Sequence, residues 1–205
     1  MHGIVSILDP PHYEKVEQIW SQLETNCGLK GVKVTAIPHF SWQVTLDYDF
    51  DALKPAMAKL ASELSPFTVR TTGLGIFTGK TDIVLYINLV KDEALLRLHQ
   101  TIWHAALPYT TRPIPYYAPE NWMPHITIGH GDVDEDRLAC ATRLLGREDF
   151  NWQIPIDNLL LVFQPEGETG VEMARFGLDE PVVKFSLEND VKLNPLSKIT
   201  KGGCV

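Results

Sequence analysis

The stretches IPHFSWQVTL (residues 37–46) and MPHITIG (residues 123–129) carry the same tetrapeptide, Pro-His-apolar-Ser/Thr. Its histidine and hydroxyl positions are His39 with Ser41 in the first stretch and His125 with Thr127 in the second. Both stretches are apolar and β-prone, and side chains at i and i+2 project from the same face of a strand. Each stretch is therefore expected to present an imidazole and a hydroxyl together.

Two such strands lying side by side would gather two imidazoles and two hydroxyls around one small volume. This set suits the handling of a phosphodiester without a metal, because one histidine takes a proton, the other gives one, and the hydroxyls hold the phosphate oxygens. The alternative is a coincidence of two unrelated strand histidines that face solvent or the core. The repeated proline and the repeated β-prone setting favour the paired site.

The elements that follow the two motifs form an internal repeat. After each motif strand, the sequence predicts an acidic turn, a helix that begins near Asp51 or Asp134, and a β stretch that opens at Phe67 or Phe150. A duplicated β-α-β unit with a pseudo-two-fold axis would bring the motif strands together at that axis. The expected fold class is α+β, with two pseudo-symmetric lobes of antiparallel sheet and outer helices around a central cleft.

The other elements are predicted from hydrophobic periodicity and from cap and turn residues. Strands are expected over residues 2–9, 67–77, 82–90 and 151–163. A β-prone run at 31–37 leads into the first motif strand, and that strand is expected to end near residue 48. Strand-like runs also occur at 173–178 and 182–188. Helices are expected over residues 12–28, 51–64, 92–107 and 134–146, a Pro- and Tyr-rich loop over 108–122, and a hairpin at 166–167. Residues 1–188 are expected to form one bilobal domain and residues 189–205 a tail.

Composition narrows the class of partner. The chain has 205 residues, 44% of them hydrophobic, and a formal net charge of -8. Proteins that grip long nucleic acid usually carry a basic surface, so a nucleic-acid substrate is expected to be small or contacted only at an end. No signal peptide and no apolar run of membrane-spanning length is evident, which predicts a cytoplasmic protein without a membrane partner. A monomer is expected.

The three cysteines, Cys27, Cys140 and Cys204, are scattered without a CxxC pair. They form no obvious disulfide framework and no zinc site, which is typical of a protein in a reducing compartment.

The paired H-x-[ST] motifs, the length, the two-lobe repeat and the stretch GLGIF (residues 73–77) followed by VLYINL resemble the 2H phosphoesterase superfamily, in its 2′-5′ RNA ligase-like branch. The family pattern, His-apolar-Ser/Thr-apolar, fits HFSW and HITI. It therefore assigns catalytic roles to His39, Ser41, His125 and Thr127, with serine in place of the commoner threonine in the first motif. The resemblance implies two antiparallel lobes flanking a cleft, no metal or other cofactor, and substrates such as 2′,3′-cyclic phosphates or 2′-5′ linkages.

The expected chemistry divides between the two histidines. For a 2′,3′-cyclic phosphate, a neutral histidine removes a proton from water while a charged histidine protonates the leaving ribose oxygen. Ser41 and Thr127 donate hydrogen bonds to nonbridging phosphate oxygens. We expect His125 to be the base and His39 the acid, although the pseudo-symmetry leaves the reverse assignment open.

Further residues are candidates for binding the substrate. Aromatic side chains stack on nucleobases, and the candidates for this role are Phe77, Tyr116, Tyr117 and Trp122. Arg112, in the same loop as the tyrosines, is a candidate for a phosphate contact. The alternatives are that Phe77 and Trp122 belong to the core and that Arg112 is a solvated surface charge.

Two other motifs are discounted. The sequence Gly79-Lys80-Thr81 resembles the end of a P-loop, but a strand follows it where a P-loop needs a helix. His125 and His130 are spaced so that they fall on opposite faces of a strand, which argues against a shared metal.

The favoured function is that of a metal-independent phosphodiesterase acting on a 2′,3′-cyclic or 2′-5′ phosphodiester of a small nucleotide or an RNA end. A non-catalytic module that binds nucleotides or RNA ends is an alternative, as is a 2′-5′ RNA ligase. The acidic charge balance disfavours the ligase, which has to hold two strands.

Overall fold

The computed structural model describes residues 1–34, 37–79, 82–165 and 170–178. The strands are β1 (His2–Ile7), β2 (His39–Thr45), β3 (Phe67–Thr78), β4 (Ile83–Leu89), β5 (His125–Gly129), β6 (Gln153–Ile156), β7 (Asn158–Phe163) and β8 (Val171–Gly177). The helices are α1 (Pro10–Cys27), α2 (Phe50–Glu63), α3 (Glu93–Ala106) and α4 (Glu135–Leu145), with 3-10 turns η1 (Gly31–Val34), η2 (Leu107–Tyr109) and η3 (Pro115–Tyr117).

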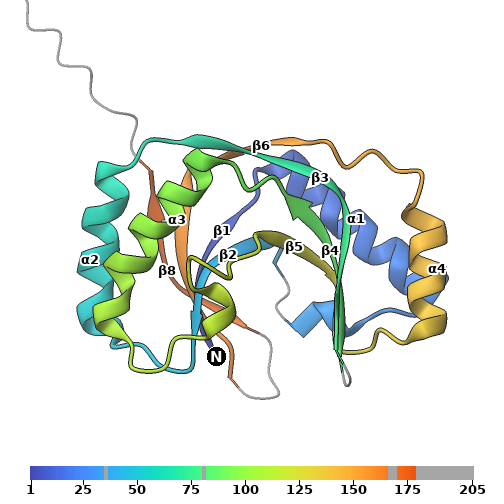
Figure 1. Cartoon of the computed structure of the whole chain (residues 1–205), viewed down its shortest axis with the longest axis horizontal. Coiled ribbons are helices and arrows are strands. Elements are labelled where there is room, and N and C mark those ends of the chain that lie inside the picture. The colour runs from blue at the N-terminus through green and yellow to red at the C-terminus, as the bar shows by residue number, and fades with distance from the viewer. Residues whose placement is uncertain (35–36, 80–81, 166–169, 179–205) are drawn as a thin grey trace, which may run out of the picture.

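The strands form two antiparallel four-stranded sheets, with the orders β2-β1-β7-β8 and β5-β4-β3-β6. The two motif strands, β2 and β5, are each the edge strand of their sheet, and they contact one another where the sheets meet (Figure 1). The expected α+β class with two antiparallel lobes is confirmed, and the motif strands lie together as the repeat predicted.

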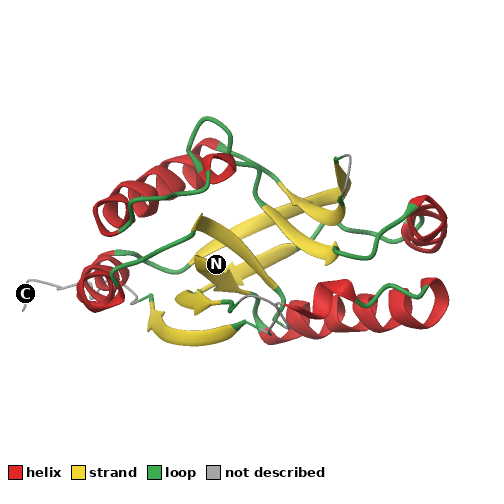
Figure 2. Cartoon of the chain, turned by 90° about the horizontal axis from the view of Figure 1, so that it is seen from below, coloured by secondary structure: helices red, strands yellow, loops and turns green. Residues whose placement is uncertain are grey.

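Helices cover the outer side of each sheet. Helices α2 and α3 flank the first sheet, and α1 and α4 flank the second (Figures 1 and 2). Three of the helices begin where an aspartate side chain accepts a hydrogen bond from a backbone N–H of the first turn, the aspartates being Asp49, Asp92 and Asp134. None of the helices in the described ranges is both long and apolar enough to cross a membrane.

Alternation along the motif strands decides which side chains face the core. Phe40 and Trp42 of β2 have no exposed surface, and the same is true of Ile126 and Ile128 of β5. The histidines and hydroxyl residues between them are half-buried. Burial of such large apolar side chains contributes about 1.5–3 kcal/mol each, so the core locks the strand register and with it the direction of the motif side chains.

Two expected strands differ from the structure. Residues 31–34 form the 3-10 turn η1, so the predicted run at 31–37 was wrong in that part. The expected strand 151–163 divides into β6 and β7, which belong to different sheets. Asn158 holds the point where the chain passes from one sheet to the other, because its side chain accepts a hydrogen bond from the backbone N–H of Ile7 and donates one to the Ile7 carbonyl. The expected hairpin at 166–167 and the run at 182–188 lie outside the described residues.

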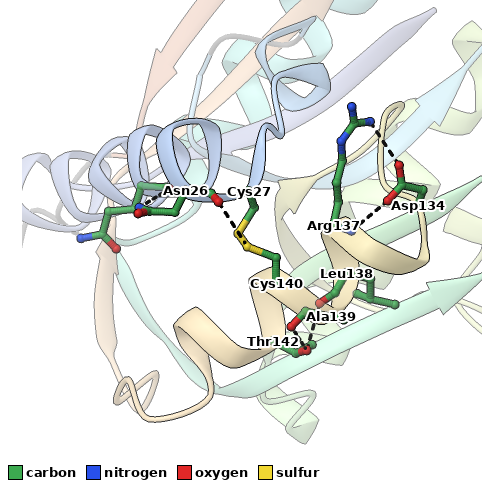
Figure 3. Close-up of a disulfide and its surroundings, with 9 residues drawn as sticks. Asn26, Cys27, Asp134, Arg137, Leu138, Ala139, Cys140 and Thr142 are labelled. Carbon is green, nitrogen blue, oxygen red and sulfur yellow. Dashed lines mark hydrogen bonds and ion pairs between the residues drawn. A yellow bond between two sulfur atoms is a disulfide. The ribbon is translucent and has the colours of Figure 1, made fainter.

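A disulfide joins Cys27, at the end of α1, to Cys140 in α4 (Figure 3). The Cα atoms are 5.7 Å apart, although the cysteines are separated by 113 positions in the sequence. The expectation of unpaired cysteines was therefore wrong for these two. Spacing alone gave no sign of the pair, because they meet only through the packing of α1 on α4. The bond also removes one reason for expecting a reducing compartment.

Reduction of this disulfide should destabilise the protein. Closing a loop of this length stabilises the folded state by up to about 4–5 kcal/mol in the chain-entropy account, and native disulfides typically contribute about 2–5 kcal/mol. Dithiothreitol is therefore expected to lower the Tm by about 5–15 °C, measured by calorimetry.

The Cys27→Ser/Cys140→Ser double variant should start at the lower Tm and be insensitive to the reductant, whereas Cys204→Ser serves as the control that retains the bond. Alkylation of three free thiols in the non-reduced native protein would contradict the bond.

Candidate active site

The two motif histidines are held in the same way. Nδ1 of His39 lies 2.7 Å from the carbonyl oxygen of Ile37, and Nδ1 of His125 lies 2.6 Å from that of Met123. A carbonyl oxygen only accepts, so each Nδ1 carries the hydrogen. Each Nε2 is then the nitrogen that is free to exchange a proton, as a lone pair on the neutral ring or as an N–H on the charged ring.

The imidazoles of His39 and His125 influence each other's protonation. Burial lowers the pKa of His39 and of His125 from the ordinary histidine value, and the carbonyl bond on each ring opposes the shift. Charge on His125 lowers the pKa of His39 further. Because two positive charges in this partly dry volume repel, the state with both rings charged is disfavoured.

Two indole N–H groups hold the motif strands at matching points. Trp122 Nε1 donates to the carbonyl of Ser41 at 2.9 Å, and Trp20 Nε1 donates to the carbonyl of Thr127 at 3.2 Å. Edge strands present backbone groups that need partners from outside their sheet. The two tryptophans supply such partners at the hydroxyl-bearing residues, one in each half of the pseudo-symmetric pair.

The first motif has an additional contact. The phenol of Tyr117, in the 3-10 turn η3 before β5, lies close enough to Ser41 for the Ser41 side chain to influence its ionisation. Burial raises the pKa of Tyr117, and the Ser41 side chain opposes that rise. Tyr117 thus lies near the motif hydroxyl of Ser41, and its expected stacking role stays a prediction.

Two aromatic rings flank His125. The ring centroid of Phe77 lies 4.9 Å from that of His125 with the planes nearly perpendicular, and Tyr86 lies 5.1 Å from His125. Tyr86 pairs with Gly75 across the strands, and a Cβ on that glycine would fall 2.2 Å from the tyrosine ring. Phe77 thus lies at the site, through its ring contact with His125. Sequence reasoning missed Tyr86, because only the register of β4 against β5 places it opposite Thr127.

Trp122 cannot stack on a base, because its side chain is 1% exposed. Its ring lies between His99, at 3.9 Å, and Trp42, at 5.5 Å. The expected substrate contact is thus wrong, and the alternative of a core position holds. Trp122 contacts the site only through the hydrogen bond that its indole N–H donates to the Ser41 carbonyl.

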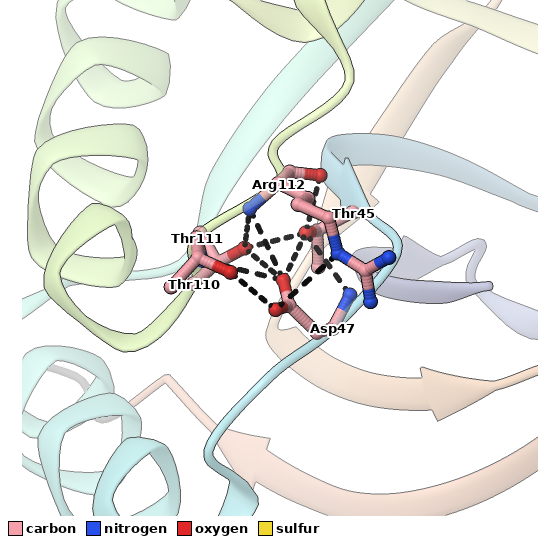
Figure 4. A network of polar contacts seen from close by, with 5 residues as sticks. All are labelled: Thr45, Asp47, Thr110, Thr111 and Arg112. Atoms are coloured by element: carbon pink, nitrogen blue, oxygen red, sulfur yellow. Dashed lines mark hydrogen bonds and ion pairs between the residues drawn. The ribbon is translucent and has the colours of Figure 1, made fainter.

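Arg112 lies away from the histidines. Its Nε is 3.6 Å from Asp47, whose carboxylate also accepts bonds from Thr110, Thr111 and the Arg112 backbone (Figure 4). The hydroxyl and amide donors, chiefly that of Thr111, hold the pKa of Asp47 well below its usual value. This cluster anchors the loop at the C-terminal end of β2, whereas His39 begins that strand.

The remaining candidate, Tyr116, is 80% exposed in η3. Its stacking role stays a prediction, because the structure describes no contact of its ring with the motif residues.

Two surface hollows lie elsewhere. One of about 310 Å³ is lined by Arg70 to Thr72, Val90 and residues 151–153, and one of about 100 Å³ by residues of β3 and α3. Neither includes a motif residue, so the cleft expected at the motif strands stays a prediction. The described part of the chain contains no group of three or more His, Cys, Asp or Glu residues that could hold a metal.

Comparison with known proteins bears on the fold. The solved structure of TT0787 from Thermus thermophilus matches with a TM-score of 0.59 at 16% identity, covering 88% of this chain and 98% of that chain. LigT of E. coli, solved with 3′-AMP, matches with a TM-score of 0.52 at 13% identity, covering 87% and 98%. A structure described as a phosphoesterase gives 0.52 at 16%, with the same coverage.

These similarities establish a shared fold. No functionally curated protein matches the chain significantly. The family profile described as the 2′-5′ RNA ligase superfamily, however, matches residues 9–168 and so includes both motifs. With its paired histidine motifs at the junction of two antiparallel sheets, the chain belongs to the 2′-5′ RNA ligase superfamily of 2H phosphoesterases.

Proposed function

We propose that this protein is a metal-independent phosphodiesterase that hydrolyses a 2′,3′-cyclic or 2′-5′ phosphodiester of a small nucleotide or an RNA end. The observation that carries the proposal is the matched tethering of the two histidines. Both rings are bound through Nδ1 to a carbonyl two residues earlier, which leaves both Nε2 atoms for proton transfer. Two histidines that were only structural would not be expected to share this arrangement at neighbouring positions.

The proposed reaction uses one ring in each protonation state. The neutral ring takes a proton from water at Nε2 as the water oxygen forms a bond to phosphorus. The bond from phosphorus to a ribose oxygen breaks, and that oxygen receives the proton from Nε2 of the charged ring. Ser41 and Thr127 donate to the nonbridging oxygens, where negative charge increases in the transition state.

The substrate class rests on size and charge. The net charge of -8 disfavours a long polyanion, so a nucleotide or an RNA terminus is the favoured ligand. LigT of E. coli, which shares the fold, was solved with 3′-AMP. In the present chain, Phe77 beside His125 offers an aromatic surface for a base.

The direct test is hydrolysis of adenosine 2′,3′-cyclic monophosphate at neutral pH in millimolar EDTA. We expect turnover to be unchanged by the chelator, because the four motif side chains supply both the proton transfers and the oxygen contacts. Product is measured by chromatography. Activity that disappears in EDTA and returns with a divalent cation would contradict the proposed mechanism, and nucleotide binding without turnover would favour the non-catalytic module.

Substitution of the histidines should reveal their joint action. His39→Ala and His125→Ala are each expected to lower kcat about 10²–10⁴-fold, the usual contribution of a general acid or base. The double variant should lose far less than the product of the two effects, because both groups act on one transition state. Ser41→Ala and Thr127→Ala should cost about 10–100-fold, since a hydrogen bond to a charged group contributes about 1.5–3 kcal/mol.

His104→Ala is the matched control. Its Nδ1 also contacts a backbone carbonyl, that of Gln100, but the residue is exposed on α3. It should retain native turnover. Near-native turnover in both motif histidine variants would exclude the two-histidine mechanism.

A further inference from the structure

The two halves of the site differ in the strand behind each motif. In the second sheet, β4 lies next to β5 and places Asn88 opposite His125 and Tyr86 opposite Thr127. In the first sheet, β1 lies next to β2 and places Ile7 opposite His39 and Val5 opposite Ser41. The side chains opposite the motif residues are thus polar and aromatic on β4 but aliphatic on β1. The two halves of the site are therefore alike in the motif strands and differ in the strands next to them.

Asn88 projects from the same face of the sheet as His125. Directly opposed residues of antiparallel strands have Cβ atoms about 4.5–5.5 Å apart and share a face. The neighbours Ile87 and Leu89 are buried in the core, at 0% and 1% exposure, while Asn88 is half-buried. Within the described residues its side-chain amide has no hydrogen-bond partner. A polar group beside a catalytic ring, partly shielded from water and without a partner, is suited to bind a ligand.

We propose that the side-chain amide of Asn88 binds the ribose of the substrate and holds the nucleoside over the second sheet, which makes Asn88 a specificity-determining residue. The inference rests on the proposed phosphodiesterase function for the identity of the substrate. The amide donates through its NH₂ group to a ribose oxygen and accepts from a ribose hydroxyl through its oxygen.

The spacing of the strands matches the parts of a nucleotide. Neighbouring strands lie about 4.8 Å apart, so β4 is one step and β3 two steps from the phosphate position at β5. A ribose bonded to that phosphate reaches β4. On β3, Phe77 pairs with Val84 and its ring lies 4.9 Å from that of His125, so it presents an aromatic surface beside the phosphate position. A Cβ added at Gly73, also on β3, would meet nothing within 4 Å. In the first sheet, the corresponding positions on β1 are aliphatic and offer no partner to a ribose.

This orientation assigns the acid and the base. With the nucleoside over the second sheet, the leaving ribose oxygen is on the side of His125, and water approaches from the side of His39. His125 then protonates the leaving oxygen and His39 activates water, the reverse of the assignment expected from the sequence.

The test compares binding of adenosine 3′-monophosphate with binding of inorganic phosphate, by calorimetry, in the native protein and in Asn88→Leu. Leucine has a similar shape and lacks the amide. We expect the Kd of the nucleotide to rise about 3–10-fold, the effect of losing one or two neutral hydrogen bonds. The Kd of phosphate should stay at the native value. Ile7→Ala, at the matching position beside His39, should change neither.

The other outcomes each overturn the inference. An equal loss for nucleotide and phosphate would mean that Asn88 contacts the phosphate, and a loss confined to Ile7→Ala would place the nucleoside over the first sheet. Unchanged binding in Asn88→Leu, with a native thermal unfolding curve, would remove Asn88 from the site. The measurement is independent of turnover, so absence of cyclic phosphate hydrolysis would reject the proposed function while leaving the ribose contact to be judged by binding.

Discussion

The contact between two edge strands is the constraint on which the rest of this structure depends. Strands β2 and β5 end their sheets, and each therefore has one side without a neighbour in its own sheet. They pack against each other, and the indoles of Trp20 and Trp122 donate to the carbonyls of Thr127 and Ser41. An exposed edge strand can pair with other chains, so the contact between β2 and β5 covers two edges as well as bringing the motifs together.

The same junction explains why the site needs so few residues. The core-facing side chains of β2 and β5 are fully buried, which fixes the direction of the alternate side chains on the opposite face. The proline before each histidine has no N–H, and the backbone carbonyls of Ile37 and Met123 each accept from an Nδ1. Local backbone and strand pairing thus orient both imidazoles without a carboxylate partner.

Much of this arrangement could be predicted from the sequence because it depends on short-range patterns. The i, i+2 spacing placed His39 with Ser41 and His125 with Thr127 on one face of each strand, and the repeat indicated that the strands meet. The helices expected to begin near Asp51 and Asp134 begin at Phe50 and Glu135. Phe77, a candidate for stacking on a base, lies beside His125, and its stacking role stays a prediction.

Other features depend on contacts between segments that are distant in the sequence, and local sequence patterns do not reveal such contacts. Trp122 was taken for a stacking surface because its sequence neighbours are loop residues, yet it fills space between His99 and Trp42. The disulfide arises only when α1 packs on α4. The pairing of Asn88 with His125 required the register of β4, which no local pattern reveals.

The central claim is that His39 and His125 share one volume and exchange protons only through Nε2. Nitrogen-15 NMR of the histidine side chains across pH, in the native protein and in His125→Gln, tests it most directly. We predict that Nδ1 of both rings stays protonated throughout, that both pKa values lie below the ordinary histidine value, and that the pKa of His39 rises when His125 is replaced, because a neighbouring charge is removed. Two rings that titrate near the ordinary histidine pKa, with His39 indifferent to the substitution, would contradict the account.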